Sequence, residues 1–202
     1  MSIYQKFCRE IKDSQGNLQR LDLDYPADFN FGYDVADAIA DESPDKTALV
    51  WCNTENEERT FTFGDIRKYS NRMANVFREA GIRRGMRVML VLKRHYEYWF
   101  AVIALHKLGV TVIPATHMLT VDDFVYRLKK SEADAVVCTP QSDVPDKISK
   151  ALDTVGRSCI KWTVQQNAAG FRSLTAELER AAETLERHET KTTDTMLLYF
   201  TS

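Results

Sequence analysis

The sequence lacks most of the features that mark a membrane-spanning, secreted or disulfide-stapled protein. Its longest apolar run covers only residues 98–105, whereas a helix needs roughly 18–20 apolar residues to span a bilayer. No N-terminal apolar stretch resembles a signal peptide. The four cysteines form no Cys-x-x-Cys pair, and scattered cysteines of this kind are typical of reduced proteins. We therefore expect a cytoplasmic protein without an integral membrane segment.

Metal-ligand patterns and an excess of one charge are missing as well. The spacing of His95, His106, His117 and His188, relative to one another and to the cysteines, fits no common metal site, so we expect no metal bound by them. The formal net charge of −2 gives no reason to expect a nucleic acid or an anionic membrane as a partner. The content of 44% hydrophobic and 28% charged residues is that of an ordinary globular protein.

At 202 residues the chain could form one large domain or two small ones. Residues 1–30 are polar and mixed, and they indicate an N-terminal extension. Residues 34–40 indicate a short helix. Two strand-like runs, 47–52 and 59–63, flank a polar turn, which predicts a β-hairpin.

From Thr62 onwards, helical and strand patterns alternate. Thr62 with Asp65, and Thr120 with Asp123, match the capping box that begins a helix. The periodicity predicts helices over residues 62–80, 96–108, 120–131, 143–155 and 173–189, and strands over residues 87–92, 110–114, 134–138, 159–164 and 195–200. Such alternation with short connections predicts an α/β fold, in which helices flank both faces of a mostly parallel sheet. Strands 87–92, 110–113 and 134–138 should be parallel neighbours.

The apolar run 195–200 leads directly into Thr201 and Ser202. A buried strand followed by hydroxyl residues is how a phosphate-binding loop begins, because backbone N–H groups and hydroxyls there surround phosphate oxygens. Taken alone, the same pattern also fits an ordinary strand end. Ligands of open α/β sheets bind beyond the carboxyl ends of the strands, and Thr201, Ser202 and residues 115–117 are expected at such ends.

Several stretches together resemble the N-terminal part of the adenylate-forming superfamily, which contains acyl-CoA synthetases, peptide-synthetase adenylation domains and luciferases. Residues 45–50 with 59–63 resemble its opening hairpin, residues 104–114 (Ala-Leu-His-Lys-Leu-Gly-Val-Thr-Val-Ile-Pro) resemble its first signature motif, and residues 198–202 look like the start of its phosphate-binding motif. Residues 29–35 and 91–94 look most like the medium-chain acyl-CoA synthetase branch. The family's members are more than twice as long.

The resemblance implies a domain organisation and a reaction. Residues 1–30 would be an extension, and residues 31–202 would be an incomplete part of the large AMP-binding domain, truncated at the start of the phosphate-binding loop. In the parent reaction a carboxylate attacks the α-phosphate of ATP to give acyl-AMP and pyrophosphate, and the thiol of CoA then displaces AMP. ATP, Mg²⁺ and CoA are therefore implied, together with a carboxylic (fatty) acid substrate.

Three site residues follow from the resemblance. Thr201 and Ser202 match the start of the loop that holds the ATP phosphates. Arg127 matches an arginine that faces the CoA phosphates in some acyl-CoA synthetases, although a solvated helix arginine beside Lys129 and Lys130 is the simpler interpretation. His117 is more simply explained as a polar loop residue than as part of a thiol channel. None of the 202 residues is expected to be catalytic.

The resemblance leaves several alternatives open. The chain alone is expected to be inactive and to self-associate. It could be a non-catalytic module that binds CoA or a nucleotide, a purely structural fragment, or part of another adenylate-forming enzyme, such as an aryl-CoA ligase or a peptide-synthetase adenylation domain.

Overall fold

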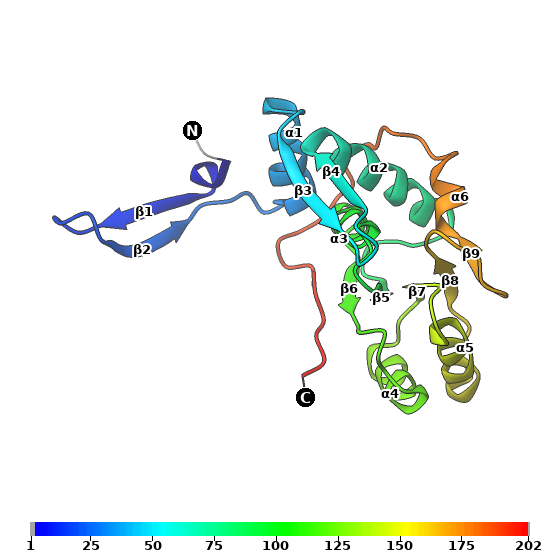
Figure 1. Cartoon of the computed structure of the whole chain (residues 1–202). Coiled ribbons are helices and arrows are strands. Elements are labelled where there is room, and N and C mark those ends of the chain that lie inside the picture. Colours follow the sequence, from blue (N-terminus) through cyan, green and yellow to red (C-terminus); the bar gives the residue numbers. More distant parts are fainter. Residues whose placement is uncertain (1–2, 202) are drawn as a thin grey trace.

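A computed structural model describes residues 3–201, and a parallel sheet forms the centre of the body (Figure 1). Within these residues, five strands pair in the order β6-β5-β7-β8-β9. Their bounds are β5 Arg87–Val91, β6 Thr111–Pro114, β7 Ala135–Cys138, β8 Ile160–Thr163 and β9 Arg172–Ser173. Each neighbouring pair in this sheet is parallel. The predicted fold class is confirmed, as is the parallel pairing of the strands on either side of β5.

Helices cover both faces of the sheet, as Figure 1 shows. Val88 and Leu90 of β5 belong to one buried cluster, which also contains side chains of α2 (Phe63–Glu79) and α3 (Glu97–Lys107). Met89 and Val91 belong to a second cluster, together with side chains of α4 (Val121–Ser131) and α5 (Val144–Val155). Successive side chains of a strand point to opposite faces, so a continuous apolar strand fills both layers of the core at once.

Both capping boxes expected from the sequence are present. The backbone N–H of Asp65 donates to the hydroxyl of Thr62 (3.1 Å), and the backbone N–H of Thr62 donates to the Asp65 carboxylate (2.9 Å) at the start of α2. Thr120 and Asp123 form the same reciprocal pair at the start of α4. These bonds satisfy backbone donors that a helix cannot satisfy internally, and they fix where each helix begins.

The N-terminal region contains more structure than its sequence predicts. The sequence indicates only a polar extension over residues 1–30, but η1 (Ile3–Lys6) is followed by an antiparallel hairpin of β1 (Cys8–Lys12) and β2 (Leu18–Leu23). The hairpin turn is stabilised locally, because the Asp13 carboxylate accepts the backbone N–H groups of Gln15 (2.8 Å) and Asn17 (2.9 Å). Figure 1 shows this hairpin projecting away from the body.

The segment between the two hairpins agrees with expectation. A π-helical turn, η2 (Phe31–Asp37), continues into the short helix α1 (Ala38–Glu42). The second hairpin, β3 (Thr47–Cys52) with β4 (Glu58–Thr62), forms as predicted and is antiparallel.

Two expectations for the C-terminal third are wrong. The helix predicted over residues 173–189 ends early, because α6 covers only Leu174–Leu178. Beyond it, side chains of α2 take the backbone carbonyls that a helix would need: Asn75 donates to the carbonyls of residues 182 and 184, and Asn71 donates to that of residue 183. The strand expected over residues 195–200 is reduced to one parallel bridge, between Leu197 and Val112.

Candidate functional site at the carboxyl edge of the sheet

Thr201 and His117, two of the residues singled out from the sequence, fall on one edge of the sheet. Because the strands are parallel, their carboxyl ends lie together. We call this region the carboxyl edge; it comprises the loops after β5, β6, β7 and β8 (residues 92–96, 115–120, 139–143 and 164–166) and the end of the chain, residues 198–201.

The end of the chain reaches the carboxyl edge alongside β6. Val112 donates its backbone N–H to the carbonyl of Met196 (3.0 Å), and Leu198 donates to the carbonyl of Val112 (2.9 Å). Leu198 and Phe200 pack against the core cluster that α4 and α5 share with the sheet. These contacts deliver Thr201, which is exposed, to the edge where ligands of such sheets bind. Ser202 lies outside the described residues.

Arg127, the second candidate, lies beside this segment. Its guanidinium carbon is 5.4 Å from the centroid of the Phe200 ring, and its Nη1 donates to the backbone carbonyl of Asp123 at 3.3 Å and lies 3.5 Å from the Asp123 carboxylate. The Arg127 side chain is 22% exposed. The pairing with Asp123 is what a surface helix arginine would make, and the contact with Phe200 places the guanidinium beside the residue that precedes Thr201.

The loops at this edge carry further positive charge. Partial burial lowers the pKa of His117, and the charges of Lys93, Arg94 and Lys147 lower that pKa further. A neutral His117 among three cations gives a region of positive potential. Such a region favours anionic ligands such as phosphates.

Four polar side chains beneath these loops form a connected set that the sequence analysis missed. His95 contacts Thr139 through Nε2 (2.9 Å), and Gln165 donates to the Glu97 carboxylate (3.2 Å). His95 and Glu97 are each only 5% exposed. The sequence places His95 directly after a predicted strand and Glu97 at the start of a predicted helix. However, a pattern in the sequence does not reveal which loops meet.

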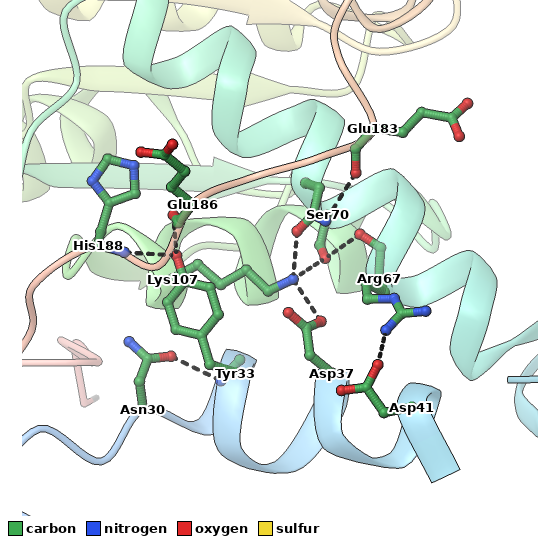
Figure 2. A network of polar contacts seen from close by, with 12 residues as sticks. Asn30, Tyr33, Asp37, Asp41, Arg67, Ser70, Lys107, Glu183, Glu186 and His188 are labelled. Carbon is green, nitrogen blue, oxygen red and sulfur yellow. Dashed lines mark hydrogen bonds and ion pairs between the residues drawn. The ribbon is translucent and has the colours of Figure 1, made fainter. Parts of the chain in front are cut away.

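A second polar network lies at the opposite edge, around Lys107 (Figure 2). Lys107 ends α3, four residues before β6 begins, so it marks the amino edge of the sheet. Its ammonium group is fully buried and donates to Asp37 (2.7 Å), Asn71 (2.7 Å) and Ser70 (3.0 Å). Burial lowers the pKa of Lys107 and raises the pKa of Asp37, while the attraction between the two opposes both shifts. Because all three protons of the ammonium are bonded, this lysine ties elements together and is not free to act on a ligand.

The network also anchors the C-terminal part of the chain. Figure 2 shows the Tyr33 ring beside Lys107. The Tyr33 hydroxyl donates to the carbonyl of Glu186 (3.3 Å) and accepts the backbone N–H of His188 (3.1 Å). Gly32 permits this packing, because a Cβ at that position would lie 2.6 Å from Cγ of Lys107. The sequence analysis identified the motif of residues 104–114, which contains Lys107, but it did not predict that Lys107 joins these elements.

An apolar cavity of about 490 Å³ lies between the root of the N-terminal hairpin and the body. Its lining includes Phe7, Leu23, Phe29, Phe31, Val110 and Met196. His106 also lines it, and burial lowers the pKa of His106 to about 4. The cavity includes neither Thr201 nor Arg127, so it is separate from the carboxyl edge.

The described residues do not fit a magnesium site of their own. Within residues 3–201 no group of three or more His, Cys, Asp or Glu side chains could hold a metal ion, and Mg²⁺ prefers several oxygen ligands. In the same part of the chain, no helix is long and apolar enough to cross a membrane.

Comparison with known proteins identifies relatives over almost the whole chain. The family model described as "AMP-binding enzyme" matches residues 36–202. The human mitochondrial acyl-coenzyme A synthetase ACSM3 is 32% identical over 195 residues, and human mitochondrial ACSM2A is 33% identical over 197 residues. These matches cover 91% and 92% of this chain, but 32% and 33% of the relatives. The chain thus spans about a third of the length of the curated relatives it matches.

Solved structures share the fold. An acyl-CoA synthetase of Brucella canis superposes with a TM-score of 0.75 at 22% identity, covering 86% of this chain and 31% of that chain. A long-chain-fatty-acid-CoA ligase of Archaeoglobus fulgidus gives a TM-score of 0.76 at 21% identity, covering 89% and 35%. These likenesses extend the shared fold to distant sequences.

Proposed function

The chain belongs to the AMP-binding enzyme family, and from this membership we propose that it forms the N-terminal part of an acyl-CoA synthetase fold. The complete fold would activate a carboxylic acid with ATP, releasing pyrophosphate and forming acyl-AMP. The thiol of CoA would then attack the acyl carbon and release AMP. A carboxylate oxygen is a poor leaving group, whereas AMP leaves readily from the mixed anhydride.

Within this proposal, Thr201 and Ser202 contact phosphate oxygens of ATP, and Arg127 faces the phosphates of CoA. The observation that carries the proposal is the position of Thr201: it lies within the residues matched by the family model, at the carboxyl edge, and directly follows Phe200, which Arg127 contacts. Charged donors stabilise phosphate groups strongly. Bound Mg²⁺ would neutralise charge on the nucleotide, but the described residues supply no ligand set for it.

We propose that the 202-residue chain alone is inert. Rate enhancement in such reactions depends on preorganised donors aimed at the charge of the transition state, and the proposed contacts to the ATP phosphates within this chain are limited to Thr201 and Ser202. The chain should catalyse no carboxylate-dependent exchange of pyrophosphate into ATP and should form no acyl-CoA. Robust exchange by the purified chain would overturn this part of the proposal.

The alternative is a module that binds CoA or a nucleotide without catalysis. It is favoured by Arg127 and the cations around His117, which are in place within the described residues. Phosphorus NMR of CoA titrated with the chain separates the two: binding without exchange supports the module, whereas neither binding nor exchange leaves the chain a structural part of the synthetase fold. Sequencing the gene beyond codon 202 tests the parent assignment, because Gly-Thr-Thr-Gly or a near variant should follow.

The cellular location and the partners are also proposals. All four cysteines are free, which supports a reducing compartment such as the cytoplasm, whereas the names of the matched human relatives include "mitochondrial". Fractionation of the source cells distinguishes these locations. We further propose that the chain associates with itself or with a separately supplied complementary part of the synthetase fold, because apolar side chains of the N-terminal hairpin are exposed.

A further inference from the structure

Four polar side chains, three of them buried, join three loops of the carboxyl edge. We call this set the strand-end tie; it consists of His95, Glu97, Thr139 and Gln165. His95 follows β5, Glu97 begins α3, Thr139 follows β7 and Gln165 comes shortly after β8. His95 and Glu97 are 5% exposed and Thr139 is 0% exposed, whereas Gln165 is exposed. Water therefore cannot replace the contact between His95 and Thr139 without a local opening.

The contacts run in sequence across the sheet. Nε2 of His95 is 2.9 Å from the hydroxyl of Thr139. Nδ1 of His95 is 4.0 Å from Oε2 of Glu97. Gln165 then donates its amide to Oε1 of the same carboxylate at 3.2 Å. The tie therefore connects the end of β7 with the end of β8 through the loop that separates β5 from α3.

Each of the three loops also contains a strained residue. Arg94 (φ 49), Ser142 (φ 60) and Gln165 (φ 61) adopt the left-handed region without being glycine. Such conformations persist only where the surrounding structure holds them, and they concentrate at functional sites. Three strained loops joined by these polar contacts indicate an arrangement that is maintained against a local cost.

A hydrolytic role for these residues is excluded by access. The order hydroxyl, imidazole, carboxylate resembles that of a Ser-His-Asp triad. However, Thr139 has no exposed surface, and its hydroxyl already accepts the backbone N–H of Gln141 (3.3 Å). A substrate cannot reach this oxygen, so the arrangement serves the protein's own loops.

The surroundings of the imidazole favour one position of the proton on His95. Nδ1 faces a carboxylate oxygen, and a lone pair there would be repelled, whereas an N–H would be attracted. The Thr139 hydroxyl can then donate its proton to Nε2 of His95 while it accepts the backbone N–H of Gln141. The hydroxyl thus acts as donor and acceptor at the same time. The neutral imidazole with its proton on Nδ1 fits the hydrogen bond with Thr139 and is attracted by the Glu97 carboxylate, which at 4.0 Å lies beyond hydrogen-bond distance.

We propose that His95 and Glu97 are positioning residues that hold the loops after β5, β7 and β8 in their strained conformations, with His95 neutral and protonated on Nδ1. The inference rests on the proposed function, because that function gives the reason for holding these loops: they form the edge at which nucleotide and CoA would bind. It extends that function by assigning a role to side chains that contact no ligand.

The charges around the pair set the expected pH dependence. Burial, and then the Lys93 charge, lower the pKa of His95. Burial raises the pKa of Glu97, against the effects of its own backbone N–H, Gln165 and Arg59. Because the folded protein disfavours the imidazolium, the stabilising contribution of neutral His95 is present above about pH 6.5, the ordinary histidine value, and is lost as the pH falls below it. The loops should open more often in acid.

Hydrogen exchange measured by mass spectrometry tests the tie, with two matched variants. Thr139→Val removes the hydroxyl that contacts His95. Thr163→Val is the control, because Thr163 is equally buried, ends the neighbouring strand, and has a hydroxyl without a hydrogen-bond partner in the structure. Thr139→Val should raise the exchange of residues 93–96 about five- to tenfold, the factor for losing one hydrogen bond, and Thr163→Val should not.

Two readouts go beyond loss of stability. After correction for intrinsic rates, wild-type exchange of these loops should rise between about pH 7 and about pH 5, on either side of the histidine value, and His95→Gln should abolish the rise, because it removes the group that titrates. In the wild type, nitrogen-15 NMR of the imidazole should show the Nδ1–H tautomer.

An Nε2–H tautomer would overturn the proposal, as would equal exchange in the two variants. The tautomer measurement needs only the wild type and stands even if Thr139→Val does not fold. Neither ATP nor CoA enters these experiments, so failure of ligand binding would contradict the proposed function and leave this result unaffected.

Discussion

The guanidinium of Arg127 lies over the ring of Phe200, with 5.4 Å between the guanidinium carbon and the ring centroid. The neighbouring Tyr126 ring meets Phe200 edge-on at 6.0 Å. Helix α4 therefore holds the residue that immediately precedes Thr201. In the proposed function this contact brings the candidate CoA contact and the candidate ATP contact together, although they come from distant parts of the sequence.

Replacing Arg127 tests whether the contact serves a ligand. Arg127→Gln should weaken CoA binding by about 1–2 kcal/mol, a factor of roughly 5–30, because a charged donor to phosphate is lost. Isothermal titration calorimetry at low salt measures the change. Lys130→Gln is the control: it removes an exposed positive charge from the same helix. Equal affinity in both variants would mean that Arg127 is an ordinary helix arginine paired with Asp123.

Lys107 should be the most sensitive polar position in the fold. Lys107→Met leaves the Asp37 carboxylate and two side chains of α2 without their buried partner, and removing one member of a buried ion pair costs about 3–5 kcal/mol. Urea denaturation monitored by circular dichroism measures the loss. Lys150→Met, at an exposed position, should change the free energy of unfolding by less than about 0.5 kcal/mol.

A double variant separates the ion pair from the packing around it. Lys107→Met combined with Asp37→Leu removes both charges, and buried pairs replaced by apolar side chains often lose little stability. The double variant should therefore be more stable than Lys107→Met alone. If the two are equally destabilised, the shape of the lysine stem beside Gly32 contributes more than its charge.

Much of the body could be predicted from local patterns. The two capping boxes and the parallel strands around β5 formed as expected, because each is determined by neighbouring residues or by a continuous apolar run. The helix predicted over residues 173–189 failed for a non-local reason: Leu178, Ala181 and Leu185 do pack on the core, but Asn71 and Asn75 of α2 hold the intervening backbone carbonyls. Apolar spacing alone cannot detect such competition.

The candidate site was predictable to a similar degree. The motif at the end of the chain placed Thr201 at the carboxyl edge, and the helix after Thr120 placed Arg127 on α4. The strand-end tie was not predictable, because His95, Thr139 and Gln165 follow different strands and meet only once the sheet order is known. The N-terminal hairpin was missed since Asp13 stabilises its turn through side-chain contacts within an otherwise polar stretch.

The stability of the protein should decline in mild acid because of His106. Burial lowers its pKa to about 4, and both ring nitrogens are buried without a hydrogen-bond partner in the structure. In the unfolded chain the pKa is about 6.5, so the unfolded state binds the proton first as the pH falls. The stability present above pH 6.5 is lost between about 6.5 and 4, by at most about 3 kcal/mol.

Comparing variants isolates this contribution. His106→Leu should flatten the dependence of the free energy of unfolding on pH over that interval, whereas His117→Leu, at a half-buried loop position, should retain most of it. Urea denaturation at several pH values gives both curves. Parallel curves for wild type and His106→Leu would show that the imidazole reaches water more easily than its buried position indicates.

The N-terminal hairpin should make the protein associate. Leu18, Leu21 and Leu23 of β2 are 52%, 49% and 67% exposed, and a two-stranded hairpin that projects from the body is at best marginally stable alone. Exposed apolar side chains on such a strand favour pairing with another chain. Light scattering over a concentration series should therefore show species larger than the monomer.

Leu21→Lys combined with Leu23→Lys should shift the population towards monomer, because charge on an exposed strand opposes pairing. Val50→Lys, at an equally exposed position of β3 in the body, should leave the distribution unchanged. A wild-type protein that stays monomeric at high concentration, and does not bind a complementary part of the synthetase fold, would show that the hairpin is stable without a partner.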